Sequence, residues 1–152
     1  MLSKIQKFIA LSREEKKLFI EAYMTLGIMR AAILTVSFKR LTRTLHHHTN
    51  PIKPPVLTDH QIRVASVVGL AIHRAAAYTP WKSSCLVQAL TVQRMLQKRG
   101  IPGIFHLGVM KDKTTDDQIK AHAWSQCGEN IITGANGSEK FTVISIFGWG
   151  RE

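Results

Sequence analysis

Cysteine and histidine are residue types used in covalent catalysis, and Cys85 and His122 lie at sequence positions that favour this role. Cys85 follows Ser83 and Ser84, either of which is a natural N-cap, so we expect the cysteine in the first turn of a helix. The positive end of a helix favours the thiolate form of a cysteine. His122 comes 37 positions later, in an alternating segment typical of a strand. A thiolate and a histidine that shares its proton are the parts of cysteine-based nucleophilic catalysis. The alternative for Cys85 is a small buried hydrophobic residue.

Capping signals predict the helices that precede these residues. Ser12 and Glu15 form a capping box, and the apolar spacing after it predicts a helix that could run to about Leu45, with a kink near 35–37. A second box, Thr58 with Gln61, opens a helix rich in Ala and Gly. The Pro-rich segment 51–57 between them reads as an extended connector. The helix that begins near Cys85 should stop at Gly100.

Alternating segments predict an antiparallel sheet in the second half of the chain. We expect strands over 103–110, 120–127, 131–133 and 141–147, joined by polar or Gly-rich turns. Helices first and a meander of strands afterwards predict the α+β class. We therefore expect one domain over 1–152, with a helical part (1–50), the connector (51–57) and a catalytic core (58–152).

The composition indicates which classes of binding partner and which cellular compartment to expect. Lys and Arg number 21 against 10 Asp and Glu, a net charge of +11, which indicates an acidic partner or a solvated basic surface. The basic residues are not interleaved with aromatics in one segment, which argues against nucleic acid. Two cysteines and no signal peptide indicate a reducing, cytoplasmic setting. The apolar window 18–36 contains Glu21 and Arg30, so we expect a buried amphipathic helix and no membrane span, with contact to a membrane surface as the alternative.

No cofactor or metal is expected. The triplet His46-His47-His48 has adjacent side chains that diverge, and no cysteine or carboxylate lies nearby in the sequence. Walker, Gly-x-Gly-x-x-Gly and zinc spacings are absent from the sequence.

The sequence motifs around Cys85 and His122 resemble those of a known family. Cysteine at a helix start followed by histidine on a strand is the arrangement of papain-like and transglutaminase-like folds. Four motifs are similar to the transglutaminase-like leader peptidases of lasso-peptide biosynthesis: Trp81-x-x-x-Cys85-Leu86-x-x-Ala89-Leu90, Met95-Leu96-x-x-Arg99-Gly100-Ile101-Pro102, Leu107-Gly108-Val109 and Ala121-His122-Ala123-Trp124. Thr133-Gly134 and Phe141-Thr142-Val143 fit as well. The resemblance spans nearly the whole chain, with its specific motifs in 81–147.

The resemblance implies a cysteine protease that removes the leader from a ribosomally made precursor peptide. It implies a small separate leader-recognition protein (a RiPP recognition element) as partner, and an ATP-dependent lasso cyclase acting afterwards. Cys85 matches the nucleophile and His122 the general base of this family. The backbone N–H of Cys85 is the best candidate for an oxyanion donor.

The third catalytic residue is where the sequence departs from the family. Some members carry an Asp 12 positions after the histidine, and here that position is Gly134. We expect the group that orients His122 to lie within 133–136 and favour Asn136, with Thr133 and a backbone carbonyl as rivals. Asn136-Gly137 also reads as a plain turn. The missing Asp motivates a second hypothesis, a non-catalytic member of the fold that binds a peptide or a partner.

Two tryptophans flank the predicted catalytic pair. Trp81 precedes Cys85 by four positions, and Trp124 follows His122 by two. Either could wall a substrate groove, or both could anchor the packing of helix on sheet. Cys127, beside a predicted turn, is expected to be a thiol without a role.

Overall fold

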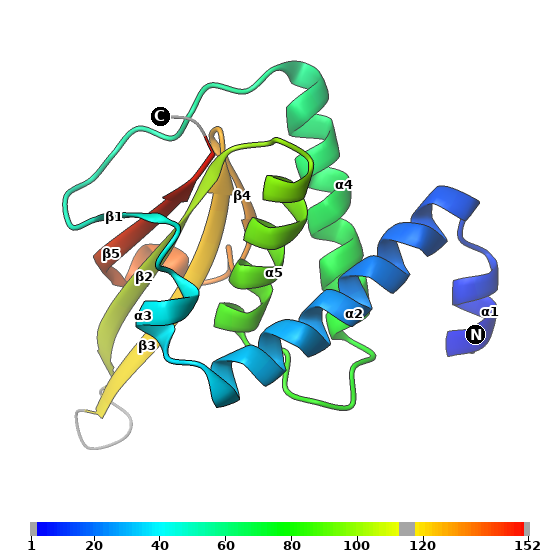
Figure 1. Ribbon diagram of the computed structural model, residues 1–152. Helices are drawn as coiled ribbons and strands as arrows, with labels where there is room; N and C mark the ends of the chain where they lie inside the picture. The colour runs from blue at the N-terminus through cyan, green and yellow to red at the C-terminus, as the bar shows by residue number, and fades with distance from the viewer. Residues whose placement is uncertain (1–2, 113–117, 151–152) are drawn as a thin grey trace.

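The fold is a layer of helices on one face of a five-stranded sheet (Figure 1). The computed structural model describes residues 3–112 and 118–150. In chain order the elements are α1 (Lys4–Ile9), α2 (Arg13–Thr35), α3 (Phe38–Leu41), β1 (His46–His48), α4 (Asp59–Ala76), α5 (Cys85–Lys98), β2 (Gly103–Asp112), β3 (Gln118–Cys127), β4 (Asn130–Thr133), the 3-10 turn η1 (Ser138–Lys140) and β5 (Thr142–Trp149). This arrangement confirms the α+β class.

The predicted N-caps begin the three long helices. The side chains of Ser12, Thr58 and Ser84 accept hydrogen bonds from backbone N–H groups at the starts of α2, α4 and α5. The expected break after α2 is present, because Val36 is extended (φ −122°, ψ 140°) and Ser37 caps the short α3.

Three elements were not predicted: α1, β1 and the 3-10 turn η1. Ser3 opens α1 with a capping box, in a segment that we had treated only as a lead-in to α2. The histidine triplet, interpreted as linker, forms the edge strand β1 against β5. A polar turn was expected between the strands 103–110 and 120–127, but β2 extends to Asp112 and β3 starts at Gln118, and residues 113–117 lie outside the described part of the chain.

The sheet is antiparallel with strand order β1-β5-β2-β3-β4, so the expected simple meander is wrong. After β4 the chain does not turn back beside it. It crosses the sheet through η1 and enters β5 next to β2, where Val109 pairs with Thr142. The crossing is close: a Cβ built on Gly108 would lie 2.8 Å from Phe141 Cβ. The absence of a side chain at Gly108 therefore makes room for the crossing segment.

Alternation along the strands separates the two faces of the sheet. Phe105, Ala123, Cys127 and Phe147 belong to the main core, together with buried residues of α2, α4 and α5. Their neighbours His106, His122 and Trp124 point to the opposite face, on which η1 lies (Figure 1). We call these the helix face and the η1 face of the sheet.

An ion pair fixes α5 against α2. The two guanidinium nitrogens of Arg99 donate to the carboxylate oxygens of Glu21 at 2.9 and 2.6 Å. Lys98 Nζ lies 3.7 Å from the same carboxylate. These contacts, chiefly the Arg99 hydrogen bond, hold the pKa of Glu21 below its ordinary value. Both side chains of the Arg99–Glu21 pair are about three-quarters covered, at 27% and 25% exposed, so the bridge is more than a surface contact.

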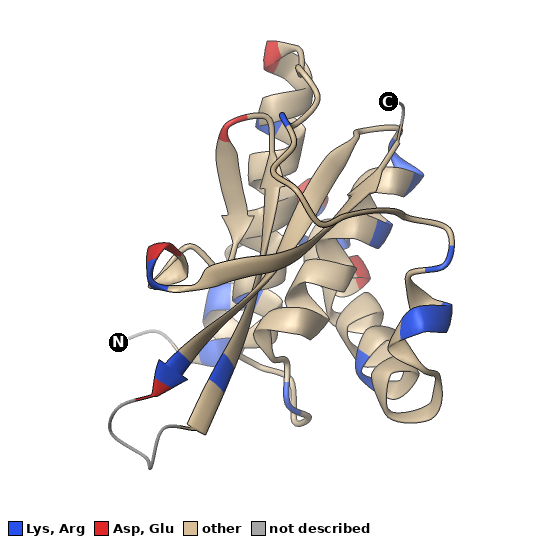
Figure 2. Cartoon of the chain, turned by 90° about the vertical axis from the view of Figure 1, so that its left-hand side faces the viewer, with Lys and Arg blue, Asp and Glu red and all other residues tan. Residues whose placement is uncertain are grey.

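One helix, α2, is long and apolar enough to span a membrane by length and composition, a test that core helices of soluble proteins also pass. Its core side carries Ala22, Leu26 and Met29. Its other side leaves Ile20, Met24 and Ile28 more than half exposed. Basic positions are spread over helices, strand ends and connecting segments and do not form a single stripe (Figure 2).

Candidate active site

Cys85 is the first residue of α5, as predicted. Ser84 caps the helix, accepting from the backbone N–H of Val87 at 3.5 Å, and its carbonyl accepts from Gln88 N at 2.9 Å. Within the described residues, no hydrogen bond occupies the backbone N–H of Cys85 or Leu86. The Cys85 thiol is partly exposed. Cys85 therefore lies at the start of a helix with two unoccupied backbone N–H groups, which could receive an oxyanion.

The loop before Cys85 is held by local hydrogen bonds. The Thr79 hydroxyl pairs with that of Ser83 at 2.7 Å and lies 3.2 Å from the carbonyl of Trp81. The Gln88 amide donates to the Ser83 carbonyl at 2.9 Å, from the second turn of α5 back to the loop. These contacts order the approach to α5 and so fix the position of the cysteine.

His122 lies in the middle of β3 with its ring oriented by a backbone group. Its Nε2 lies 2.8 Å from the carbonyl oxygen of Gly134. A carbonyl only accepts hydrogen bonds, so Nε2 carries the proton and Nδ1 is the basic nitrogen. The ring also stacks on Trp124 at 5.7 Å and lies 5.0 Å from the ring of Phe141. The tautomer and the orientation of His122 are therefore both defined.

The group that orients His122 lies within the predicted interval, but it is the backbone rival. Asn136 is exposed in the turn that follows and makes no hydrogen bond with His122 among the described residues. The Thr133 hydroxyl is engaged elsewhere, 2.7 Å from that of Ser125 in the core. In the structure the hydrogen-bond partner of His122 is the Gly134 carbonyl, and a catalytic role of Asn136 stays a prediction. The signal was the spacing, since Gly134 is 12 positions after His122, inside the predicted interval 133–136.

Cys85 and His122 are not paired in the structure. The Cys85 side chain packs against the main core on the helix face, whereas His122 points to the η1 face. No hydrogen bond joins the two residues in the part of the chain that the structure describes. The fold brings α5 onto β3, and the catalytic roles of the two side chains stay predictions.

The two tryptophans lie on different sides of the sheet. Trp81 packs in the helix layer, edge-to-face with Tyr23 at 5.1 Å and against Gly27, where a Cβ would lie 3.1 Å from its ring. Trp124 is buried on the η1 face. They do not wall one groove together, and of the two only Trp81 packs against the main core of the helix layer. Contact of either ring with a substrate stays a prediction.

His106 is a residue near the site that the sequence analysis did not single out. It pairs with Trp124 across β2 and β3, and their rings stack at 5.0 Å. Burial lowers its pKa, an effect that the Trp124 backbone partly opposes. Its buried Nδ1 has no hydrogen-bond partner among residues 3–112 and 118–150. The alternation of side chains along β2 was the available signal, because it places His106 on the same face of the sheet as its cross-strand partner Trp124.

The remaining cysteine and the histidine triplet lie outside this group. Cys127 is buried in the core, and burial raises the pKa of its thiol to about 12. His47 stacks on Phe147 at 4.8 Å on the helix face. His46 and His48 point to the other side, so the three imidazoles diverge, as adjacent residues of a strand must. Within residues 3–112 and 118–150, no cluster of three metal-binding side chains occurs.

The comparisons with known proteins identify the family. Residues 32–146 match the model of the transglutaminase-like superfamily, a segment that includes Cys85, His122 and the whole of β2, β3 and β4. The chain belongs to the transglutaminase-like superfamily. No curated protein and no solved structure is significantly similar to it. Transglutaminase-like domains are in general those of cysteine peptidases and transglutaminases, which is consistent with a cysteine-protease type of fold for this transglutaminase-like protein.

Proposed function

We propose that this transglutaminase-like protein is a cysteine peptidase that removes the leader from a lasso-peptide precursor, together with a separate leader-recognition protein and ahead of a cyclase. The observation that carries the proposal is the setting of Cys85, a partly exposed cysteine at the start of α5, where the backbone N–H groups of Cys85 and Leu86 have no partner within the described residues. The basic nitrogen of His122, defined by its bond to Gly134, supports it. The substrate class, a lasso-peptide precursor, is inferred from the resemblance of the sequence motifs.

The chemistry assigns one role to each residue. The Cys85 thiolate attacks the scissile carbonyl, and the N–H groups of Cys85 and Leu86 receive the oxyanion of the tetrahedral intermediate. His122, protonated at Nδ1, gives that proton to the leaving amine, which leaves an acyl-enzyme thioester. Water then attacks the thioester while His122 takes its proton, which releases the leader acid and restores the thiolate.

This chemistry requires contact between Cys85 and His122, which no hydrogen bond joins in the described part of the chain. We propose that binding of the precursor and the recognition protein brings the two side chains together, since catalytic contacts often form only in the substrate complex.

The unpaired thiol and imidazole also favour a second candidate, a non-catalytic member of the fold that binds a peptide or a partner. Gly134 in place of an Asp supports that reading too. In this case Cys85 would be dispensable.

Cleavage of the precursor peptide decides between the two candidates. The protein is incubated with the precursor and the recognition protein, and the products are weighed by mass spectrometry. We expect one cut, abolished by Cys85→Ala and lowered at least about a hundredfold by His122→Ala. Cys127→Ala is the matched control and should cut normally, because its thiol is buried away from the site. Absence of a cut with bound precursor, or full activity of Cys85→Ala, would refute the peptidase.

A further inference from the structure

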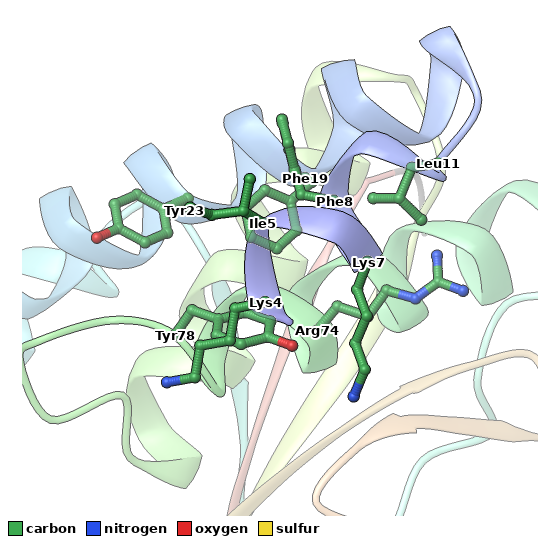
Figure 3. A pocket seen from close by; sticks show the side chains of 9 residues that line it. All are labelled: Lys4, Ile5, Lys7, Phe8, Leu11, Phe19, Tyr23, Arg74 and Tyr78. Atoms are coloured by element: carbon green, nitrogen blue, oxygen red, sulfur yellow. The ribbon is translucent and has the colours of Figure 1, made fainter. Parts of the chain in front are cut away.

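A hollow of about 570 Å³ lies between α1, the first half of α2 and the C-terminal end of α4 (Figure 3). None of the residues that line it comes from α5 or from the sheet, so it is separate from Cys85 and His122. Its walls are Lys4, Ile5, Lys7, Phe8, Leu11, Phe19, Tyr23, Arg74 and Tyr78. Its volume is in the range of sites that hold a small ligand or one or two large side chains.

The floor of the hollow is a continuous group of aromatic rings. Phe19 lies at its centre, 5.3 Å from Phe8, 6.2 Å from Tyr23 and 6.1 Å from Tyr78, between ring centroids. Ile5, 72% exposed, extends the apolar surface at the mouth. Rings in these relative positions are fixed by one another, so the hollow presents a preformed apolar surface.

The rim carries only positive charge. Lys4 and Lys7 come from α1 and Arg74 from α4, and among the described residues no acidic side chain lines the hollow. Lys4 Nζ lies 5.3 Å from the centre of the Tyr78 ring. Arg74 has one acidic contact, Glu15 at 3.9 Å, and both side chains are well exposed, so the pair is weak. Figure 3 shows the Lys4 amine beside Tyr78, well apart from the ends of Lys7 and Arg74.

We propose that this hollow binds an acidic segment of the peptide substrate, with a large apolar side chain among the aromatic rings and flanking carboxylates on Lys4, Lys7 and Arg74. The identification of the ligand as substrate rests on the proposed function. Several separated cations match several carboxylates along a peptide better than the single head group of a fatty acid. The net charge of +11 attracts such a segment from a distance. The site would hold the peptide at a second point, remote from Cys85.

Binding of a defined probe tests the site without any need for catalysis. The probe is a fluorescein-labelled peptide of sequence Glu-Phe-Glu-Leu-Glu-Glu, followed by fluorescence anisotropy on the full chain. Two control peptides carry Lys for every Glu, or Ser for Phe and Leu. The variant Lys4→Glu with Lys7→Glu reverses two exposed charges on the rim. The matched control, Lys39→Glu with Arg40→Glu on α3, changes the net charge equally at another exposed place.

We expect the rim variant to weaken probe binding at least about tenfold and the α3 variant to weaken it less than about threefold. Both control peptides should bind more weakly than the probe, and Cys85→Ala should bind it normally. Equal losses in the rim and α3 variants would show unspecific attraction and overturn the proposal. Complete displacement of the probe by an equal concentration of decanoate would overturn the peptide as occupant. Cleavage of the precursor by a chain that does not bind the probe would refute the hollow alone, and binding without cleavage would refute the peptidase alone.

Discussion

Replacement of Gly134 by Ala tests the His122 site most directly, because the backbone of this glycine does two things that a side chain prevents. Its φ of +80° lies in the left-handed region, which costs other residues about 1–2 kcal/mol. A Cβ there would also lie 2.5 Å from the Ala123 carbonyl oxygen and 2.9 Å from Trp124 Cβ. Because a backbone atom blocks it, the loop has to move, at an overpacking cost of about 1–3 kcal/mol.

Gly137 is the matched control for this change. Its φ of +76° is nearly the same, but a Cβ on it would meet nothing within 4 Å. Gly137→Ala should therefore cost only the left-handed strain, about 1–2 kcal/mol, whereas Gly134→Ala should cost about 2–5 kcal/mol. In a chain of this size each kcal/mol lowers the melting temperature by about 2–4 °C. Urea titration of both variants, with calorimetry, measures the difference.

The same substitution should disturb the imidazole. Movement of the Gly134 carbonyl removes the acceptor that keeps the proton on Nε2 of His122, and the ring then loses its fixed tautomer. ¹⁵N chemical shifts of the imidazole report this change, which Gly137→Ala should not produce. Equal destabilisation by the two variants, or an unchanged His122 tautomer in Gly134→Ala, would refute the close approach and the orienting role of Gly134.

Two further predictions concern the thiols and the bridge between α2 and α5. Iodoacetamide at about pH 8 should alkylate Cys85 and spare Cys127 until the protein is unfolded, because Cys127 is buried with a pKa raised to about 12; mass spectrometry of the native protein with equal labelling of both would contradict this. Arg99→Ala should destabilise the fold by about 1–3 kcal/mol at neutral pH, through loss of a charged hydrogen-bond pair. The pKa of Glu21 is lower in the folded protein than in the unfolded chain. The contribution of the Arg99–Glu21 pair to the free energy of unfolding is therefore complete above the pKa of an unfolded glutamate, about 4.3, and disappears as the pH falls through the lowered pKa of Glu21 in the folded protein. Urea titrations of wild type and variant should therefore converge in acid, and a constant gap down to about pH 2 would show that the bridge is not its source.

The elements that could be predicted are those fixed by neighbouring residues. Thr58 and Ser84 cap helices within three positions of themselves, so the starts of α4 and α5 follow from local hydrogen bonds. The break after Thr35 follows in the same way from Ser37. The strands β2 and β3 are adjacent in the chain and alternate clearly, which predicted their existence and their antiparallel pairing, although each is two residues longer than expected.

The elements that escaped prediction depend on distant partners. β1 is a strand only because it meets β5, about a hundred residues later. The place of β5 beside β2 depends on the crossing over Gly108, which no periodicity encodes. The site shows the same division: the helix-start position of Cys85 is local and was predicted, whereas the orientation of His122 relative to α5 depends on which face of β3 the helices cover. His122 bonds to the backbone carbonyl of residue 134, a group that every residue type has. The sequence contributes to this contact only because glycine has no side chain that would block the close approach.

The position of β5 between β1 and β2 has a consequence for how the chain reaches its fold. β5 is the last of these elements to be synthesised, and it supplies the hydrogen-bond partners of both neighbours. Until it has emerged from the ribosome, β2 presents an unpaired edge and β1 has no strand to join, although the β2–β3 hairpin can already form. Closing the contact between His48 and Ile146 then restrains a long stretch of chain, which slows folding and lengthens the exposure of the edge. Chains that stall or are cut before Phe141 should accordingly be prone to aggregate through β2.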